Sequence, residues 1–249
     1  MEKYKMVSLI PARGGSKRVP HKNIKMMAGK PMLAWTIEAS LKSKYIDRTF
    51  VSTEDPVIKE VALKYGAEVI DRPVQYASDT IDGNSYEHDG IISSFKEVLW
   101  KMKYKPDYFC WLYCCFPTRT SKQIDEAFEL MIERRCTRVM TAHKMGGEAY
   151  EYFSLDKNNK AVRDFDYTKK QLYLRSLGID FQEPRYEETG HTVIMRYRDI
   201  GLHGDINYAD STLYIIDKKV PYIDVNTPLE FAVAECILKE RMERESLID

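Results

Sequence analysis

The segment from Ile10 to Asn23, IPARGGSKRVPHKN, brings two adjacent glycines, one serine and four cationic side chains together within fourteen residues. Glycine allows backbone N–H groups to approach an anion closely, and lysine and arginine supply positive charge. Phosphate is therefore the ligand that this combination favours. A solvated basic turn is the alternative interpretation.

The segment matches neither of the two familiar phosphate-binding motifs. The Walker A pattern G-x-x-x-x-G-K-[ST] needs an earlier glycine and a Ser or Thr after the lysine, whereas the chain reads GGSKR from Gly14 to Arg18. The dinucleotide pattern G-x-G-x-x-G is also absent. A phosphate site here would need a different loop.

The elements around this loop follow an alternating pattern. Apolar runs predict strands at 5–10, 48–53, 67–70, 107–116 and 138–142, and helical periodicity predicts helices at 31–44, 54–65, 85–101 and 123–134. Such alternation predicts an α/β fold with a doubly wound, mostly parallel sheet. The loop at 10–23 would then leave the carboxyl end of the first strand, which is where such sheets bind ligands.

The alternation breaks between residues 144 and 212, where short alternating segments and many tyrosines predict an inserted β-rich lobe. Such lobes often mediate dimer contacts. The α/β pattern then returns, and a last helix is expected with Thr227 as its cap, Pro228 in its first turn and Glu230 three residues after the cap. We treat residues 1–249 as one domain with this insertion.

Composition restricts the function classes. Lys plus Arg and Asp plus Glu number 38 each, which argues against a nucleic-acid coat or a membrane-surface role. No segment has the length of a signal peptide's apolar region or of a membrane span. The five cysteines form no CxxC pair and predict reduced core thiols in a cytoplasmic protein, with no zinc site (Cys110, Cys114, Cys115, Cys136 and Cys236).

Longer segments resemble one known family. IPARGGSKRVPHKNIKMMAGKPMLAWTIEAS, IDRTFVSTEDPVIKEVALKYGAEVIDRP, YASDT and YIDVNTPLEFAVAE are similar to the CMP-sugar-acid synthetases, cytidylyltransferases that activate sialic, pseudaminic and legionaminic acids. The resemblance is close over about the first 120 residues, fair over about the last 30, and weak between them. It implies a nucleotide-diphospho-sugar transferase-like Rossmann-type fold and a homodimer. It also implies transfer of CMP from CTP to an acidic sugar, with Mg²⁺ assisting and pyrophosphate leaving.

The resemblance also implies roles for individual residues. Arg13 and Lys17 would neutralise charge on the leaving pyrophosphate, and Lys22 would lie beside the α-phosphate. The nucleotide would contact eight further positions: Ala12, Gly14, Ser16, Asn23, Arg72, Ser78, Asp79 and Tyr113. The alternatives are that Asn23 satisfies a buried turn, Arg72 is a surface cation and Asp79 caps a helix, while Arg18 is expected to point into solvent. Tyr113 replaces the glutamine of the common pattern.

The metal site departs from the family pattern. IDVNT stands where the family commonly has I-D-[IV]-D-T, so Asp224 is kept and Asn226 replaces the second acid. On a strand the i, i+2 spacing points both side chains to one face, where they can share a hard cation. A weaker metal site, or a metal held mainly by CTP phosphates, is expected. The alternative is that Asp224, which the resemblance also marks as catalytic, only shapes the entry to the last helix together with Asn226.

The acceptor site departs further. The family's R-Q-x-L-P segment is missing ahead of RYEETGH, so Arg185 is a candidate clamp for a carboxylate, with Lys144, Tyr186 and His191 as further candidates. An acceptor other than sialic acid, such as a phosphonate, stays open. So does a nucleotide-binding homologue that has lost activity. Use of GTP is disfavoured, because guanylyl-type loops have a longer glycine-rich pattern.

Overall fold

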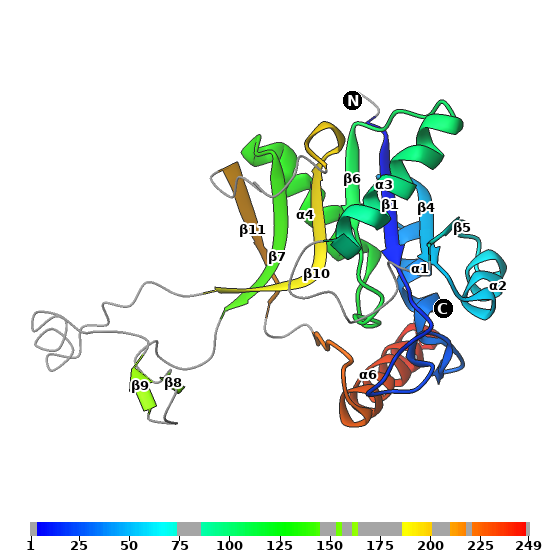
Figure 1. Cartoon of the computed structure of the whole chain (residues 1–249). Coiled ribbons are helices and arrows are strands. Elements are labelled where there is room, and N and C mark those ends of the chain that lie inside the picture. Colours follow the sequence, from blue (N-terminus) through cyan, green and yellow to red (C-terminus); the bar gives the residue numbers. More distant parts are fainter. Residues whose placement is uncertain are drawn as a thin grey trace, which may run out of the picture.

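The computed structural model describes residues 4–73, 86–144, 153–155, 161–163, 186–200, 210–217 and 221–247. Its centre is a seven-stranded sheet in the order β11-β7-β10-β6-β1-β4-β5 (Figure 1). The strands are β1 (Met6–Pro11), β4 (Ile46–Thr53), β5 (Glu68–Asp71), β6 (Tyr108–Trp111), β7 (Arg138–Lys144), β10 (Tyr186–Arg196) and β11 (Ser211–Ile215). All neighbouring pairs are parallel except those that β10 makes with β6 and β7.

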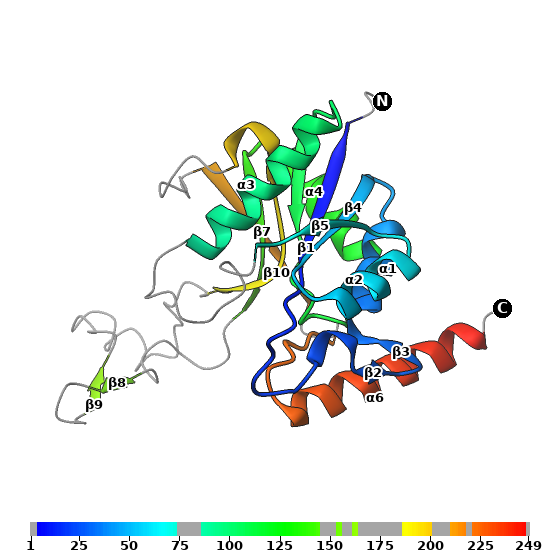
Figure 2. The same ribbon diagram turned by 45° about the vertical axis from the view of Figure 1, so that its right-hand side comes forward.

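Helices cover both faces of this sheet. They are α1 (Met32–Leu41), α2 (Pro56–Lys64), α3 (Tyr86–Lys101) and α4 (Ser121–Arg134), and a further helix, α6 (Pro228–Ser246), lies apart from these faces. One face packs against α1, α2 and α4, and the other packs against α3 (Figure 2). Strand β1 contributes to the cores on both faces because successive side chains of a strand point to opposite sides. Met6 and Ile10 pack in the core with α1, α2 and α4, and Val7 and Leu9 pack in the core with α3. This is the expected α/β architecture with a mostly parallel sheet.

The last helix packs away from the sheet faces. Helix α6 buries Phe231, Ala234 and Leu238 against Val19, Met27 and Met32, which follow β1 in the chain. This stretch also holds the 3-10 turn η1 (Lys22–Ile24) and the hairpin of β2 (Met26–Met27) and β3 (Lys30–Pro31). The expected capping box is present, because Thr227 accepts from the Glu230 N–H while Glu230 accepts from the Thr227 N–H. Packing against α6 therefore fixes where the loop after β1 can run.

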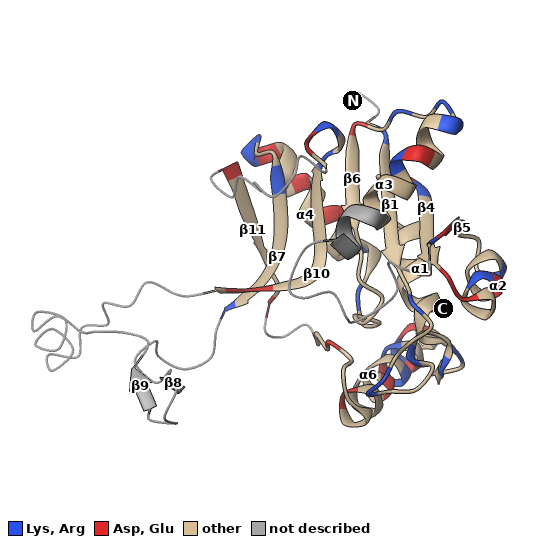
Figure 3. Cartoon of the chain, in the orientation of Figure 1, with Lys and Arg blue, Asp and Glu red and all other residues tan. Residues whose placement is uncertain are grey.

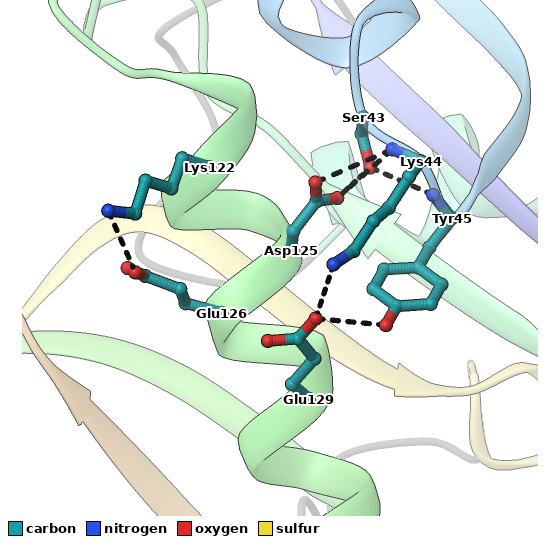
Figure 4. A network of polar contacts seen from close by, with 7 residues as sticks. All are labelled: Ser43, Lys44, Tyr45, Lys122, Asp125, Glu126 and Glu129. Atoms are coloured by element: carbon teal, nitrogen blue, oxygen red, sulfur yellow. Dashed lines mark hydrogen bonds and ion pairs between the residues drawn. The ribbon is translucent and has the colours of Figure 1, made fainter.

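A polar network joins the loop between α1 and β4 to helix α4 (Figure 4). Asp125 accepts from the Ser43 hydroxyl at 2.6 Å and from the Lys44 N–H at 3.2 Å. Glu129 accepts from the Tyr45 hydroxyl at 2.9 Å and pairs with the Lys44 ammonium at 2.6 Å. These contacts hold the edge of α4 against the start of β4.

Two expectations from the sequence were wrong in part. The strand expected at 107–116 ends at Trp111, where the chain turns, so Tyr113 and Cys114 lie in a loop. Residues 186–196, which were assigned to the inserted lobe, form β10 inside the main sheet. The strands β8 (Phe153–Leu155) and β9 (Ala161–Arg163) form a separate two-stranded sheet, and for the rest of 144–212 the lobe stays a prediction.

Within the described residues, no helix is long and apolar enough to cross a membrane.

Candidate functional site

A cavity of about 250 Å³ opens at the carboxyl ends of the parallel strands. The loops after β1, β5 and β6 meet there, together with the segment that leads into α6. The loop after β1 carries several of the basic positions coloured in Figure 3. The lining residues are Pro11, Arg13, Ser16, Lys17, Arg18, Val19, Lys22, Asn23, Arg72, Tyr113, Cys114, Cys115 and Asn226. Five of these side chains are cationic, so the cavity suits a polyanion.

The loop after β1 is shaped by contacts at its back. Ala12 is buried and its N–H donates to the Ser52 carbonyl, which extends the pairing of β1 with β4. The Gly14 N–H donates to Glu54 Oε1 at 2.7 Å, and a Cβ at Gly14 would lie 2.4 Å from Asp55 Oδ2. Ala12 and Gly14 therefore build the loop, whereas Ser16, also predicted, lines the cavity.

Glu54 supports this loop and was missed by sequence reasoning. Its second carboxylate oxygen, Oε2, is buried and has no hydrogen-bond partner within the described part of the chain. Because Glu54 occupies the Gly14 N–H, that amide is not directed at a phosphate. An acidic residue directly after a strand is common in sequences, so its type alone gave no signal of this contact.

Lys22 and Asn23 tie the loop to other parts of the wall. The Lys22 ammonium donates to the Val225 carbonyl at 2.6 Å, across 203 positions of sequence. Asn23 is 4% exposed, donates to the Arg13 carbonyl at 2.9 Å and accepts from the Cys114 thiol at 3.1 Å. Asn23 thus satisfies a buried turn, as the alternative interpretation had it, and lines the cavity as well.

Arg72 is not a surface cation. It follows β5, is 4% exposed, and donates from Nη2 to the Ser52 carbonyl at 3.1 Å. It lines the cavity together with residues of the loop after β1. Arg18 is exposed to solvent, as expected. It also lines the cavity, and it reaches Asn226 Oδ1 at 3.4 Å.

Asn226 lines the cavity, and Asp224 lies two positions before it on the segment that leads into α6. The Val225 N–H donates to the Cys115 carbonyl at 2.8 Å, which fixes this segment against the loop after β6. Asp224 Oδ1 is buried and has no hydrogen-bond partner in the described segments, and the Cys115 thiol hydrogen-bonds the same carboxylate. A buried carboxylate oxygen left open in this way fits a cation ligand. Asn226 offers a neutral carbonyl oxygen nearby.

The thiols of the cavity wall are poor nucleophiles. Burial raises the pKa of Cys110 to about 12, raises that of Cys114, and raises that of Cys115 well above its usual value. These three cysteines and Cys136 are free thiols inside or at the edge of the core, as expected, whereas Cys236 is exposed. Cys114 and Cys115 therefore shape the cavity and are not its nucleophiles.

The described residues that were predicted to bind the acceptor do not line the cavity. Lys144 and Tyr186 face each other where β7 ends and β10 begins, outside the cavity lining. His191 is 1% exposed beneath Phe116 and Tyr222, and burial lowers its pKa well below the usual value. A neutral buried ring of this kind supports the wall and does not face an acceptor. Arg185, Ser78 and Asp79 lie outside the described residues.

The fold and the cavity define an α/β protein with a cationic cavity, suited to a polyanion, at the carboxyl ends of its parallel strands. Comparison with known proteins agrees, since residues 7–203 match the cytidylyltransferase family. The chain belongs to this family.

Two relatives of known activity and one solved structure are similar to most of this chain. Pseudaminic acid cytidylyltransferase of Campylobacter jejuni is 31% identical over 202 residues, which are 79% of this chain and 76% of that protein. CMP-N,N'-diacetyllegionaminic acid synthase of Legionella pneumophila is 26% identical over 98% of this chain and all of that protein. A solved CMP:2-keto-3-deoxy-manno-octonic acid synthetase complexed with CTP aligns with a TM-score of 0.63 and 17% identity. The alignment covers 95% of this chain and 99% of the solved chain. Because the identity is only 17%, this similarity shows a shared fold and nothing more.

Proposed function

We propose that this protein transfers CMP from CTP to a nonulosonic acid, a sugar acid of the pseudaminic, legionaminic or sialic type. The observation that carries the proposal is the cavity lined by Arg13, Lys17, Arg18, Lys22 and Arg72 in a chain of the cytidylyltransferase family. The named relatives act on acceptors of this class. In the reaction, the anomeric hydroxyl of the acceptor bonds to the α-phosphorus of CTP. The bond from that phosphorus to the oxygen between the α- and β-phosphates breaks, pyrophosphate leaves, and the hydroxyl proton passes to water or to the pyrophosphate.

The chain's own residues would contribute position and charge. Phosphoryl-type transfer depends mainly on fixing the reactants and on neutralising charge that develops on the leaving group. Arg13 and Lys17 flank the segment Gly14-Gly15-Ser16 and suit the β- and γ-phosphates. Lys22 is held at its tip by the Val225 carbonyl, which restricts the ammonium to one edge of the cavity and suits the α-phosphate.

We propose Mg²⁺ as the metal, with Asp224 as its protein ligand and Asn226 as a weaker one. The open Asp224 Oδ1 supports this assignment, since Mg²⁺ prefers oxygen ligands. When bound, the ion would supply positive charge to the triphosphate. Asn226 adds no negative charge, so most of the remaining ligands would come from the phosphates of CTP. Mg²⁺ titrated in the presence of CTP should therefore bind far more tightly than Mg²⁺ alone.

We also propose a cytoplasmic homodimer. The buried free thiols suit a reducing compartment, and the resemblance to CMP-sugar-acid synthetases supports the dimer. Light scattering on the purified chain at micromolar concentration tests the oligomeric state, and a monomer would overturn that part.

The first experiment measures the pyrophosphate that is released from CTP in the presence of Mg²⁺. Each reaction contains one candidate acceptor, which is a nonulosonic acid, KDO or an aminophosphonate. Lys22→Ala is the test variant and Lys25→Ala its matched control, because Lys25 lies outside the lining and its ammonium rests on the Phe231 ring at 4.7 Å. We expect release with one nonulosonic acid, retained in Lys25→Ala and lost in Lys22→Ala. Release only with the phosphonate would overturn the acceptor class.

A second candidate is a nucleotide-binding homologue without turnover, and Asn226 in the cavity wall favours it. In that case CTP binds but no acceptor yields pyrophosphate. Asn226→Asp separates the two, since a variant that gains activity from an inactive parent indicates a damaged metal site. A parent that is active and gains little from the change is a working enzyme with its own ligand set.

A further inference from the structure

Arg119 is a buried cation without an acidic partner. It is 2% exposed and lies in the loop between β6 and α4, and no acidic side chain pairs with it among the described residues. Its Nε has no hydrogen-bond partner in the same part of the chain. An isolated buried charge is unfavourable unless something compensates it.

Its hydrogen bonds join the loop after β6, strand β10 and helix α1. One guanidinium nitrogen, Nη2, donates to the Tyr113 carbonyl at 2.9 Å and also to the His191 carbonyl. The other, Nη1, reaches the Thr36 hydroxyl of α1 at 3.4 Å. The planar guanidinium can hold several acceptors in fixed directions, which the flexible ammonium of lysine cannot do.

These bonds determine where the Tyr113 side of the cavity wall lies. Tyr113 lines the cavity, and its ring lies 3.4 Å from the position a Cβ would take at Gly190. Gly190 has a φ of +67° and belongs to the irregular part of β10 between Glu188 and Val193. The Tyr113 ring and the backbone of β10 are therefore packed against each other, and Arg119 hydrogen-bonds the backbone carbonyls of Tyr113 and His191.

The charge of Arg119 also reaches the cavity. Tyr113, Cys114 and Cys115 all line it, and Arg119 is among the cations that act electrostatically on the Cys114 thiol, together with Lys22 and Arg72. Arg119 thus adds to the positive potential of the lining residues. No acidic side chain of the described residues pairs with Arg119, and a nucleoside triphosphate bound in the cavity would bring negative charge closer to it.

We propose that Arg119 is a positioning residue of the nucleotide cavity. It holds the Tyr113 side of the wall through two backbone carbonyls, and its buried charge favours the binding of a polyanion. The inference rests on the proposed function in so far as the polyanion is CTP.

The test separates the charge from the geometry. Arg119→Lys keeps the charge and loses the planar fork, whereas Arg119→Gln loses both. Arg138→Gln is the control, because Arg138 is also a buried arginine but lies at the amino end of β7, away from the cavity. Calorimetry measures the Kd of CTP and of inorganic pyrophosphate for each protein, and circular dichroism verifies folding.

We expect Arg119→Gln to weaken both ligands about tenfold or more. Arg119→Lys should weaken CTP about tenfold but pyrophosphate by less than about threefold, since pyrophosphate senses the charge and makes no use of the Tyr113 wall. Arg138→Gln should leave the Kd of CTP and the Kd of pyrophosphate within about twofold of the parent values. A merely structural arginine would not separate the two ligands.

Each other outcome is decisive. A parent protein that does not bind CTP overturns the proposed function itself. A parent that binds CTP, with Arg119→Gln folded and binding equally well, overturns this inference alone. If Arg119→Gln does not fold, Arg119→Lys decides, and equal effects on both ligands overturn the inference. Failure of both variants to fold shows a purely structural role and also overturns it.

Discussion

Gly14 provides the sharpest test of how the loop after β1 is built. Its N–H donates to Glu54 at 2.7 Å, and a Cβ there would lie 2.4 Å from Asp55 Oδ2 and 3.1 Å from Asp55 Cβ and Cγ. The neighbouring Gly15 has nothing within 4 Å of such a Cβ. Gly14→Ala should therefore disturb the loop, while Gly15→Ala should leave its packing unchanged.

The magnitude follows from overpacking, which costs about 1–3 kcal/mol when atoms cannot move away. In a chain of this size each kcal/mol lost from the free energy of unfolding lowers Tm by about 2–4 °C, so Gly14→Ala should lower Tm by roughly 2–12 °C. Gly15→Ala should change Tm by less than about 2 °C. The same displacement moves Arg13 and Ser16, so CTP binding to Gly14→Ala should also weaken.

A second substitution tests the cause. All three close atoms belong to the Asp55 side chain, which also caps α2 by accepting from the Val57 and Ile58 N–H groups. Asp55→Gly removes all three atoms and leaves a residue that helix N-termini tolerate. Differential scanning calorimetry on the two single variants and the double variant should show that Asp55→Gly costs less in the Gly14→Ala background than alone. Additive losses, or equal losses for Gly14→Ala and Gly15→Ala, would refute the reasoning.

Three further predictions concern other parts of the molecule. A thiol reagent at neutral pH should react rapidly with the exposed Cys236 and slowly with the buried thiols, because burial raises the pKa of Cys110 and Cys114. A second thiol that reacts rapidly would contradict this prediction. The N–H groups of Asn226 and Thr227 lower the pKa of Glu230, so its carboxylate adds stability above the ordinary glutamate pKa and loses it as the pH falls. The stability gap between the parent and Glu230→Gln in urea should thus be largest near pH 7 and close toward pH 3, and a constant gap would refute it. Glu129→Gln should lower Tm slightly at low salt and less in molar salt, because Glu129 is 46% exposed in its pair with Lys44 (Figure 4); a large salt-independent loss would indicate a buried role.

The sequence alone determined the elements whose signals are local. The buried strand before the basic loop, the alternation of strands and helices, and the capping box at Thr227 and Glu230 each depend on residues within a few positions of one another. The same holds for the cationic loop itself. Its glycines and cations are contiguous, and a strand that ends directly before them places them at the ligand-binding edge of the sheet.

Only the tertiary structure decided which residues share the cavity wall. Lys22 meets Val225, and Arg18 meets Asn226, across more than 200 positions. Strand β10 enters the main sheet between β6 and β7 because of pairing with distant strands, and its own short apolar pattern is equally compatible with a separate lobe. Arg119 and Glu54 show the same principle. A charged side chain is usually exposed, and only the surrounding elements determine that Arg119 is buried, that Glu54 is half-buried, and which carbonyl or amide each of them binds.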